Sequence, residues 1–382
     1  MITPKLFTPL TIRGTTTRNR VVISPMCQYS ANKGHATNWH LVHLGRYALG
    51  GAGIVFVEAT AVEARGRISH LDLGLYEETH VESLMPVAHF LKENGAVPAI
   101  QLSHAGRKAS GHAAWQGAGP LSAEDQSFSQ APWQTVAPSA VAAEGWPLPV
   151  ALSIQDISEL IDSWRSAALR ARAAGFDIIE IHGGHGYLIH EFLSPVSNFR
   201  KDRYGGSMRN RMRFALEIVE AVRSVWPDDK PLFFRVSALD GSGGGWTLDD
   251  TVTLSRLLHQ SGVDLIDCSS GGMTGPTPTM AIPREYGFQV PFSETVRREV
   301  GILTCAVGLI IEPNLAESIV KEGKADLVAI GREALNDPNW ALHARNKLQA
   351  GEFGDWPLPF RGWLERRAAT IELLERGLSE NK

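Results

Sequence analysis

The sequence predicts an α/β fold, a closed barrel of eight parallel β-strands with helices around it, formed as a single domain over residues 1–382. Two observations lead to this prediction. Eight short apolar runs recur along the chain, and a helical pattern, or a loop and then a helix, follows each run. Most runs are continuously apolar rather than alternating, as expected for parallel strands covered on both faces. Eight strand–helix units in about 340 residues are typical of a (β/α)8 barrel.

The predicted strands are residues 21–24, 53–58, 97–102, 177–182, 232–237, 265–269, 303–307 and 327–330. An open, doubly wound sheet is the alternative architecture. Such a sheet usually carries a G-x-G-x-x-G turn after its first strand. Here Ser24-Pro25-Met26-Cys27 follows the first run instead, so the barrel is the preferred prediction.

The helices between the strands carry start and stop signals. Ser153 and Asp156 have the spacing of a capping box at the start of a long amphipathic pattern. Pro313 fits the first turn of a later helix, and Asp337-Pro338 precedes another. A further apolar stripe, expected to face the core, consists of Val81, Leu84, Met85, Ala88 and Leu91, and ends at Gly95.

Two segments depart from the strand–helix repeat. Residues 104–152 are rich in Ala, Ser, Gly, Pro and Trp and show no helical period. A loop of this length in a compact domain is usually a functional lid, and its place after the third strand would put it over the catalytic face. Residues 352–382 form a C-terminal arm, in which the proline-rich segment 356–360 is expected to be extended and to lead into a charged helix.

Composition excludes several classes of function. A net charge of -4 and a pI near 6.4 give no electrostatic basis for binding nucleic acid or an anionic membrane. No apolar run approaches the ~20 residues of a membrane span, and the N-terminus lacks the pattern of a signal peptide. Three dispersed cysteines, Cys27, Cys268 and Cys305, form neither a disulfide framework nor a C-x-x-C metal site. We therefore expect a cytoplasmic protein.

The motif His182-Gly-Gly-His185-Gly-Tyr187-Leu directly follows the fourth apolar run. Its three glycines allow positive φ angles and a close approach to a ligand. Two imidazoles can hold an oxygen atom, while the phenol of Tyr187 can give a proton and stays neutral at pH 7. The alternative is a metal pair or ordinary loop histidines. The position at a strand end and the glycines favour a catalytic cluster.

Other strand ends supply further candidates, because chemistry in such barrels collects at the carboxyl ends of the strands. Gly308, Gly331 and Arg332 would form a phosphate site between the last two strands, and an ion pair of Arg332 with Glu333 is the alternative for that side chain. Gln101 and Arg235 would point donors into the barrel. Because the strand of Arg235 carries no carboxylate, we expect an electron-rich partner such as the pyrimidine edge of a flavin.

Five motifs carry a resemblance to a known family. They are Ser24-Pro-Met-Cys-Gln-Tyr29, Gln101-Leu-Ser-His-Ala-Gly-Arg-Lys108, His182-Gly-Gly-His-Gly-Tyr-Leu188, Asn198-Phe-Arg-Lys-Asp-Arg-Tyr-Gly-Gly-Ser207 and Ala329-Ile-Gly-Arg332. From Pro4 to about Arg366 the chain resembles the Old Yellow Enzyme family of FMN-dependent ene-reductases with a (β/α)8 barrel. Cys27 and His185 resemble the thermophilic-like, xenobiotic-reductase branch. Gly183 and Gly184 stand where relatives often carry alanines, which implies added backbone freedom.

The resemblance implies roles for individual residues. His182 and His185 would bind the carbonyl or nitro oxygen of the substrate, and Tyr187 would be the proton donor to its α-carbon. Cys27 would tune the flavin, and Tyr29 would line the pocket. Arg361 or Trp363 would reach a substrate pocket, by way of a homodimer or a higher homo-oligomer. The expected FMN contacts are Ser24, Pro25, Met26, Cys27, Ala59, Gln101, Arg235, Gly308, Gly331 and Arg332.

The implied activity is reduction of FMN by NADPH or NADH, followed by transfer of a hydride to the β-carbon of an activated alkene and of a proton to its α-carbon. Alternatives within the same chemistry are a nitro or nitroester reductase and a relative of 2,4-dienoyl-CoA reductase. The latter resembles the same barrel but adds an iron–sulfur cluster and a second nucleotide domain, which the three dispersed cysteines and the chain length disfavour. A flavin-binding sensor would need no proton donor, and a metal hydrolase would need a third ligand beside the two histidines.

Overall fold

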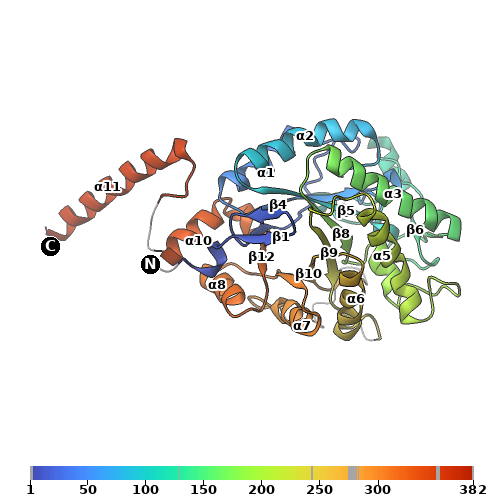
Figure 1. Ribbon diagram of the computed structural model, residues 1–382. Helices are drawn as coiled ribbons and strands as arrows, with labels where there is room; N and C mark the ends of the chain where they lie inside the picture. Colours follow the sequence, from blue (N-terminus) through green and yellow to red (C-terminus); the bar gives the residue numbers. More distant parts are fainter. Residues whose placement is uncertain are drawn as a thin grey trace.

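The computed structural model describes residues 3–128, 130–241, 244–273, 282, 284–349 and 353–380. Eight parallel strands close into a barrel (Figure 1), in which each strand pairs with its neighbours in chain order and the last pairs with the first. The strands are β3 (Val21–Ile23), β4 (Ile54–Ala61), β5 (Val97–Ser103), β8 (Ile178–Gly183), β9 (Leu232–Ser237), β10 (Leu265–Ser269), β11 (Leu303–Ala306) and β12 (Leu327–Ile330). Each lies on one of the eight apolar runs, so the barrel is confirmed and the open sheet is excluded.

The strand residues pack into two apolar layers. Alternate side chains, such as Ile178 and Phe233, fill the barrel interior, while their neighbours Ile179 and Phe234 pack against the surrounding helices. Both layers are buried, which explains why the strands read as continuous apolar runs. A short hairpin that sequence analysis did not anticipate, β1 (Leu10–Ile12) and β2 (Thr15–Thr17), places Ile12 in the inner layer.

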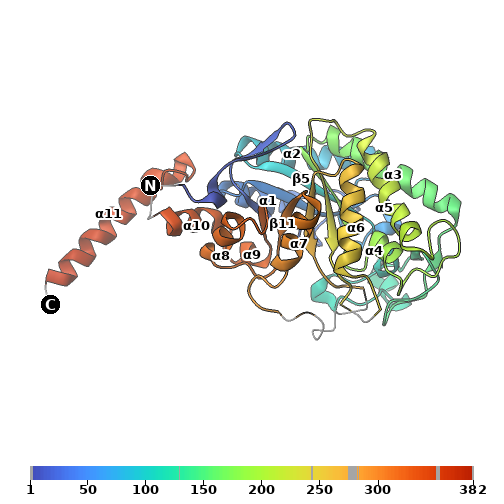
Figure 2. The ribbon, with the colours of Figure 1, turned by 60° about the horizontal axis from the view of Figure 1, so that its bottom comes forward.

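Helices surround the barrel (Figures 1 and 2), and several begin where the sequence predicted. The Asp156 backbone N–H donates to the Ser153 hydroxyl at 3.1 Å, and Pro313 is the first residue of its helix. The side chain of Met85 is 49% exposed, so its assignment to the buried stripe was wrong. The helices are α1 (Asn38–Leu49), α2 (Glu78–Glu93), α3 (Ile154–Ala173), α4 (Leu188–Leu193), α5 (Met208–Arg223), α6 (Leu248–Gln260), α7 (Val290–Val300), α8 (Pro313–Lys321), α9 (Arg332–Asn336), α10 (Trp340–Gln349) and α11 (Leu358–Glu380).

The long excursion after β5 lies over the carboxyl ends of the strands. It contains short 3-10 turns, η3 (Gly106–Lys108), η4 (Ala114–Gln116) and η5 (Ala123–Phe128), and a two-stranded sheet, β6 (Val136–Ala137) and β7 (Val150–Ala151). Trp115 of η4 meets the ring of Tyr29 edge to face at 5.6 Å. The Arg107 guanidinium donates to the Met273 carbonyl at 3.0 Å and to the Val141 carbonyl at 3.2 Å, which ties the excursion to the loop after β10.

The C-terminal arm differs from its prediction. Helix α11 begins at Leu358, so residues 358–360 are helical rather than extended. Pro359 falls in the first turn of α11, where a backbone N–H has no partner within the helix and proline is tolerated. In Figures 1 and 2, α11 projects away from the barrel on the side of α10. Within the described chain, no helix has the length and apolarity needed to cross a membrane.

Candidate active site

Two histidines and a tyrosine lie together at the carboxyl end of β8. The ring centroid of His182 is 5.0 Å from that of His185 and 5.3 Å from that of Tyr187, and it meets both rings nearly edge to face. His182 is buried near the end of the strand, whereas His185 and Tyr187 follow the strand and are partly exposed. The structure thus gathers the three residues that the motif singled out.

The glycines of this motif serve two different purposes. Gly186 has a φ of 72° and follows His185, which itself has a φ of 59°, so two consecutive residues are left-handed. Gly183 and Gly184 do not have positive φ, contrary to expectation. An added Cβ would lie 2.3 Å from the Phe234 ring at Gly183 and 2.9 Å from a backbone nitrogen at Gly184. These two glycines therefore allow close packing of β8 on β9, and the backbone freedom expected of them is not available.

Burial fixes the protonation states of the cluster. It lowers the pKa of His182 well below its usual value, and the Arg235 charge adds to this effect, so the imidazole is neutral at pH 7. Burial also raises the pKa of Tyr187 well above its usual value, so the phenol keeps its proton. Nδ1 of His182 accepts a hydrogen bond from the Gly184 backbone N–H at 3.4 Å, which leaves the ring proton on Nε2. The cluster therefore offers an N–H and an O–H donor.

His185 has a different environment from His182. Its Nε2 lies 2.7 Å from the Ser269 hydroxyl, and its backbone N–H donates to the Ser237 hydroxyl at 2.8 Å. Burial, together with the positive charge of Arg235, lowers the pKa of His185 well below its usual value. His185 is therefore also neutral at pH 7, but one of its ring nitrogens already has a partner on β10.

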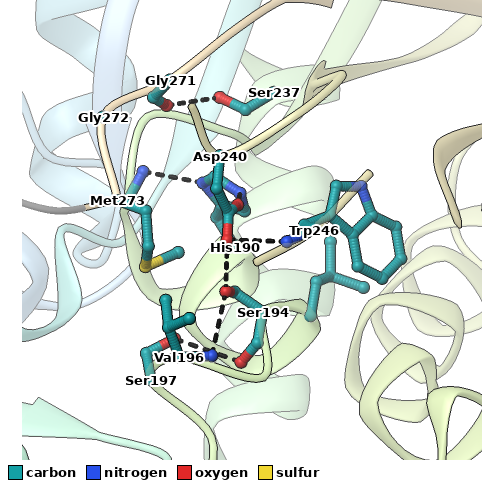
Figure 3. A network of polar contacts seen from close by, with 12 residues as sticks. His190, Ser194, Val196, Ser197, Ser237, Asp240, Trp246, Gly271, Gly272 and Met273 are labelled. Atoms are coloured by element: carbon teal, nitrogen blue, oxygen red, sulfur yellow. Dashed lines mark hydrogen bonds and ion pairs between the residues drawn. The ribbon is translucent and has the colours of Figure 1, made fainter. Parts of the chain in front are cut away.

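A buried polar network holds the turn between the histidines and Tyr187 (Figure 3). Nδ1 of His190 accepts from the Gly186 backbone N–H at 2.9 Å, and its Nε2 donates to Asp240 at 2.7 Å. Asp240 also accepts from the Ser194 hydroxyl and the Trp246 backbone N–H. Burial alone would raise the pKa of Asp240, but these hydrogen bonds outweigh burial and hold that pKa below its usual value. Sequence reasoning missed His190 and Asp240, because the motif gives no sign that they meet.

Lys108 approaches the same turn from η3. Its ammonium group donates to the carbonyls of His185 at 2.6 Å and Gly272 at 2.8 Å, and lies 5.0 Å from the centre of the Tyr187 ring. Burial lowers the pKa of Lys108 to about 8, although Glu191 opposes the shift. Lys108 therefore ties this turn to the loop after β10 and makes a cation–π contact with Tyr187.

The loop after β3 carries Cys27 and Tyr29 beside this cluster. Glu58 of β4 accepts from the Gln28 backbone N–H at 3.0 Å and so anchors the loop. Burial raises the pKa of the Cys27 thiol well above its usual value, which keeps the sulfur uncharged. Tyr29 has a positive φ of 48° and packs under Trp115. Pro25 and Met26 lie in the same loop and Ala59 in β4, as the sequence placed them.

The donors inside the barrel have partners that the sequence did not reveal. Arg235 pairs with Asp267 of the adjacent strand β10, with Nη1 3.4 Å from Oδ2, and donates to the Ser24 hydroxyl at 3.0 Å. The strand of Arg235 carries no carboxylate, as the sequence indicated, but the adjacent strand supplies one. Gln101 donates to Glu180 of β8 at 2.7 Å.

A cavity of about 330 Å³ opens at the ends of β11 and β12. Gly308, Gly331 and Arg332 line it, and so does Glu333, with no ion pair between Arg332 and Glu333 among the described residues. Gln289 also lines the cavity and accepts from the Ser270 hydroxyl at 2.6 Å. No sequence motif marks Gln289, because it lies in the long segment before α7.

Two predicted residues do not join the site. Arg361 and Trp363 lie on α11, which projects away from the barrel of its own chain (Figure 1). Trp363 is 71% exposed. Any contact of these residues with a substrate pocket would therefore be with the pocket of another subunit.

Comparison with known proteins gives one consistent result. Residues 5–350 match the NADH:flavin oxidoreductase / NADH oxidase family. The chain is 47% identical to an NADPH dehydrogenase of Geobacillus sp. (strain WCH70) over 346 residues, which cover 90% of this chain and 94% of that protein. It is 43% identical to an NADPH dehydrogenase of Bacillus subtilis (strain 168), with coverage of 94% of this chain and 99% of that protein.

Solved structures show the same architecture. Morphinone reductase superposes with a TM-score of 0.76 at 25% identity, covering 91% of this chain and 90% of that chain. A 2-naphthoyl-CoA reductase complex superposes with a TM-score of 0.80 at 25% identity, covering 91% of this chain and 52% of that chain. The present chain thus spans about half the length of the latter protein.

Proposed function

Because the chain belongs to the NADH:flavin oxidoreductase / NADH oxidase family and is therefore an FMN-dependent oxidoreductase, we propose that it is an ene-reductase that uses NADPH. The proposed substrates are alkenes activated by a carbonyl or nitro group. The observation that carries this proposal is the pair of donors, His182 Nε2–H and the neutral Tyr187 phenol, on rings 5.3 Å apart.

The residues at the barrel mouth fit FMN. Nε of Arg235 is buried and has no hydrogen-bond partner among the described residues, so a donor is left for a ligand. The cavity lined by Gly308, Gly331 and Arg332 joins glycines to a guanidinium, which suits a phosphate. An added Cβ at Gly331 would meet only Met26 and Ser24, at 3.9 and 4.0 Å, so the space beside it is open. We assign Ser24, Gln101 and Arg235 to the flavin ring, and Gly308, Gly331 and Arg332 to the phosphate.

The protein residues act on the alkene substrate. Bound FMN would supply the redox chemistry, which is the net transfer of a hydride from NADPH to the alkene. His182 would hold the substrate's oxygen through its Nε2–H, with His185 beside it, and this polarisation stabilises the negative charge that develops on the oxygen. Tyr187 would then donate its proton to the α-carbon. Tyr29 and Trp115 would cover the pocket and exclude water.

A visible spectrum of the purified protein tests the proposal. We expect flavin absorption bands that bleach with NADPH under anaerobic conditions and return when an enone is added. The matched saturated ketone is the control, because it can bind through its oxygen but has no alkene to reduce. Product analysis should show reduction of the carbon–carbon bond alone. A flavin that bleaches but recovers only with oxygen, and with no enone or nitroalkene, would rule out the ene-reductase activity.

A further inference from the structure

Four polar side chains lie next to one another inside the barrel. They come from the neighbouring strands β5, β8, β9 and β10, and all are at most 6% exposed. Strand register places Gln101 beside Glu180 and Arg235 beside Asp267. Gln101 Nε2 donates to Glu180 Oε1 at 2.7 Å, and Arg235 Nη1 lies 3.4 Å from Asp267 Oδ2. Each carboxyl group thus has one oxygen with a partner.

The other oxygen of each carboxyl group has no donor. Glu180 Oε2 and Asp267 Oδ1 are buried and have no hydrogen-bond partner among the described residues. The two carboxyl groups lie close enough to hydrogen-bond to each other, but only if one of them carries a proton. Leaving a buried acceptor unsatisfied costs about 1–3 kcal/mol, and more for a charged group. Two adjacent carboxylates beside one arginine would also repel each other, so two ionised side chains do not suit this arrangement.

We propose that Glu180 and Asp267 share one proton between Oε2 and Oδ1, that Glu180 carries it, and that this acid pair sets the charge around the FMN ring. The inference rests on the proposed FMN site. The assignment of the proton follows from the partners. Asp267 faces the Arg235 cation, which favours its ionised form, whereas Glu180 accepts only from the neutral amide of Gln101.

Electrostatics supports this assignment. Burial raises the pKa of Glu180, the negative charge of Asp267 raises it further, and Arg235 opposes both effects. Burial also raises the pKa of Asp267, but Arg235 and a hydrogen bond from a protonated Glu180 counteract the rise. The nearby thiols of Cys268 and Cys305 stay uncharged, because burial raises the pKa of each well above its usual value. His182, whose imidazole is neutral, follows Glu180 by two residues on the same face of β8.

The acid pair has consequences for the flavin. A flavin gains negative charge when it is reduced, so Arg235 favours reduction and an ionised Asp267 opposes it. A protonated Glu180 adds no charge, but it holds Gln101 in a fixed orientation through its carbonyl oxygen. The pair would therefore leave Arg235 partly neutralised. Ionisation of Glu180 at alkaline pH would add a second negative charge and lower the flavin midpoint potential further.

Two amide variants separate the partners. Glu180→Gln keeps an acceptor for Gln101 and gives an N–H to Asp267, so it mimics the protonated acid. Asp267→Asn, made together with Glu180→Gln so that Glu180 cannot ionise in its place, removes the proposed negative charge. Spectroelectrochemistry of the FMN-loaded proteins at neutral pH should show little change for Glu180→Gln. When Asp267→Asn is added, the affinity ratio for reduced over oxidised FMN should rise tenfold or more, which is about 30 mV upward for a two-electron couple. At alkaline pH, the potential of the unmodified protein should fall more steeply than that of Glu180→Gln.

Infrared spectroscopy of the FMN-free protein gives an independent readout. A carboxylic acid C=O stretch should be present at neutral pH and should be lost in Glu180→Gln. The proposal is overturned if the C=O band persists in Glu180→Gln, or if both variants shift the flavin potential equally. If Asp267→Asn does not fold, the infrared comparison with Glu180→Gln decides alone. If the protein binds no FMN, the proposed function fails, whereas the infrared result still tests the shared proton.

Discussion

Nε2 of His190 lies 2.7 Å from Oδ1 of Asp240, and neither side chain is accessible to solvent. The pair connects the backbone of Gly186, directly before Tyr187, with the loop after β9. His190 and Asp240 do not belong to the donor cluster itself. They position it, because they fix the turn from which Tyr187 emerges.

The first prediction concerns this positioning pair. Asp240→Asn should destabilise the protein by about 1–3 kcal/mol, because it leaves a buried polar group imperfectly paired. It should also lower the rate of enone reduction, but less than Tyr187→Phe does. Chemical denaturation and steady-state kinetics measure the two effects. Asp162→Asn is the control, since Asp162 forms an exposed ion pair with Arg165 that contributes less than about 1 kcal/mol. Equal stability losses in both variants would contradict the prediction.

The second prediction concerns the proton donor. Tyr187→Phe should slow reoxidation of the flavin by an enone by roughly 10²–10⁴-fold, the range of a positioned general acid. Reduction of the flavin by NADPH should remain nearly unchanged, because that step needs no proton from Tyr187. Stopped-flow measurements separate the two half-reactions. Tyr29→Phe, which removes a neighbouring phenol, is the matched control. If both half-reactions slow equally in Tyr187→Phe, the proposed role is wrong.

The third prediction concerns Cys27. We expect its uncharged thiol to lie against the flavin and to tune its midpoint potential without acting as a nucleophile. Cys27→Ala should shift the flavin potential while turnover persists. A tenfold change in the affinity for reduced FMN relative to oxidised FMN corresponds to a shift of about 30 mV in the midpoint potential. Cys268→Ala is the control, because that buried thiol belongs to the layer against the helices. An unshifted potential, or loss of all activity with normal FMN content, would show that Cys27 has another role.

The fourth prediction concerns the C-terminal arm. Exposed apolar residues on α11, among them Leu358, Trp363 and Leu373, would be covered in a dimer. We expect Arg361 or Trp363 to reach the pocket of a neighbouring subunit, as in a two-fold assembly that exchanges an arm. Sedimentation or light scattering should show at least a dimer. Deletion of residues 357–382 should weaken that assembly.

A mixed dimer tests whether Arg361 acts across subunits. One subunit carries Tyr187→Phe and the other carries Arg361→Ala, and each homodimer should be impaired. If the arm acts on its neighbour, the Arg361→Ala subunit keeps its own Tyr187 and receives Arg361 from its partner, so one working site per mixed dimer returns. If Arg361→Ala alone is impaired but mixing restores nothing, Arg361 acts within its own chain.

The fifth prediction concerns stability at acidic pH. Burial lowers the pKa of His43 to about 4, and the charge of Arg46 adds to this effect. The unfolded chain binds this proton near pH 6.5. Between about pH 6.5 and 4 the unfolded state therefore holds more protons, so the folded state loses stability as the pH falls through this window.

His43→Gln should remove that part of the pH dependence. Between pH 7.5 and 4.5 the free energy of unfolding falls in both proteins, but the fall should be about 2–3 kcal/mol smaller in His43→Gln. The reason is that each pH unit is worth at most about 1.4 kcal/mol per histidine. Urea denaturation at the two pH values measures this. His89→Gln is the control, because the side chain of His89 is 71% exposed. Parallel loss in the protein and in His43→Gln would refute the prediction.

The sequence alone determined the barrel and most of the candidate site. Strands buried on both faces are mostly apolar without alternation, so all eight runs were visible without tertiary information. A capping signal such as Ser153 with Asp156 is local, since donor and acceptor are three residues apart. His182, His185 and Tyr187 were recognisable because they follow one strand within one short motif.

Only the tertiary structure decided which residues meet across strands. The partner of Arg235 lies on β10, 32 residues away, and that of Gln101 on β8, 79 residues away. For the same reason, sequence analysis missed the pairing of His190 with Asp240 and the position of Gln289 beside Gly308. The helical start of α11 was missed because Pro359 is its second residue. Proline usually breaks a helix, and it is tolerated only in the first turn, whose position the sequence does not show. A pattern along the chain reports local geometry and burial, whereas the pairing of buried charges depends on how the barrel closes.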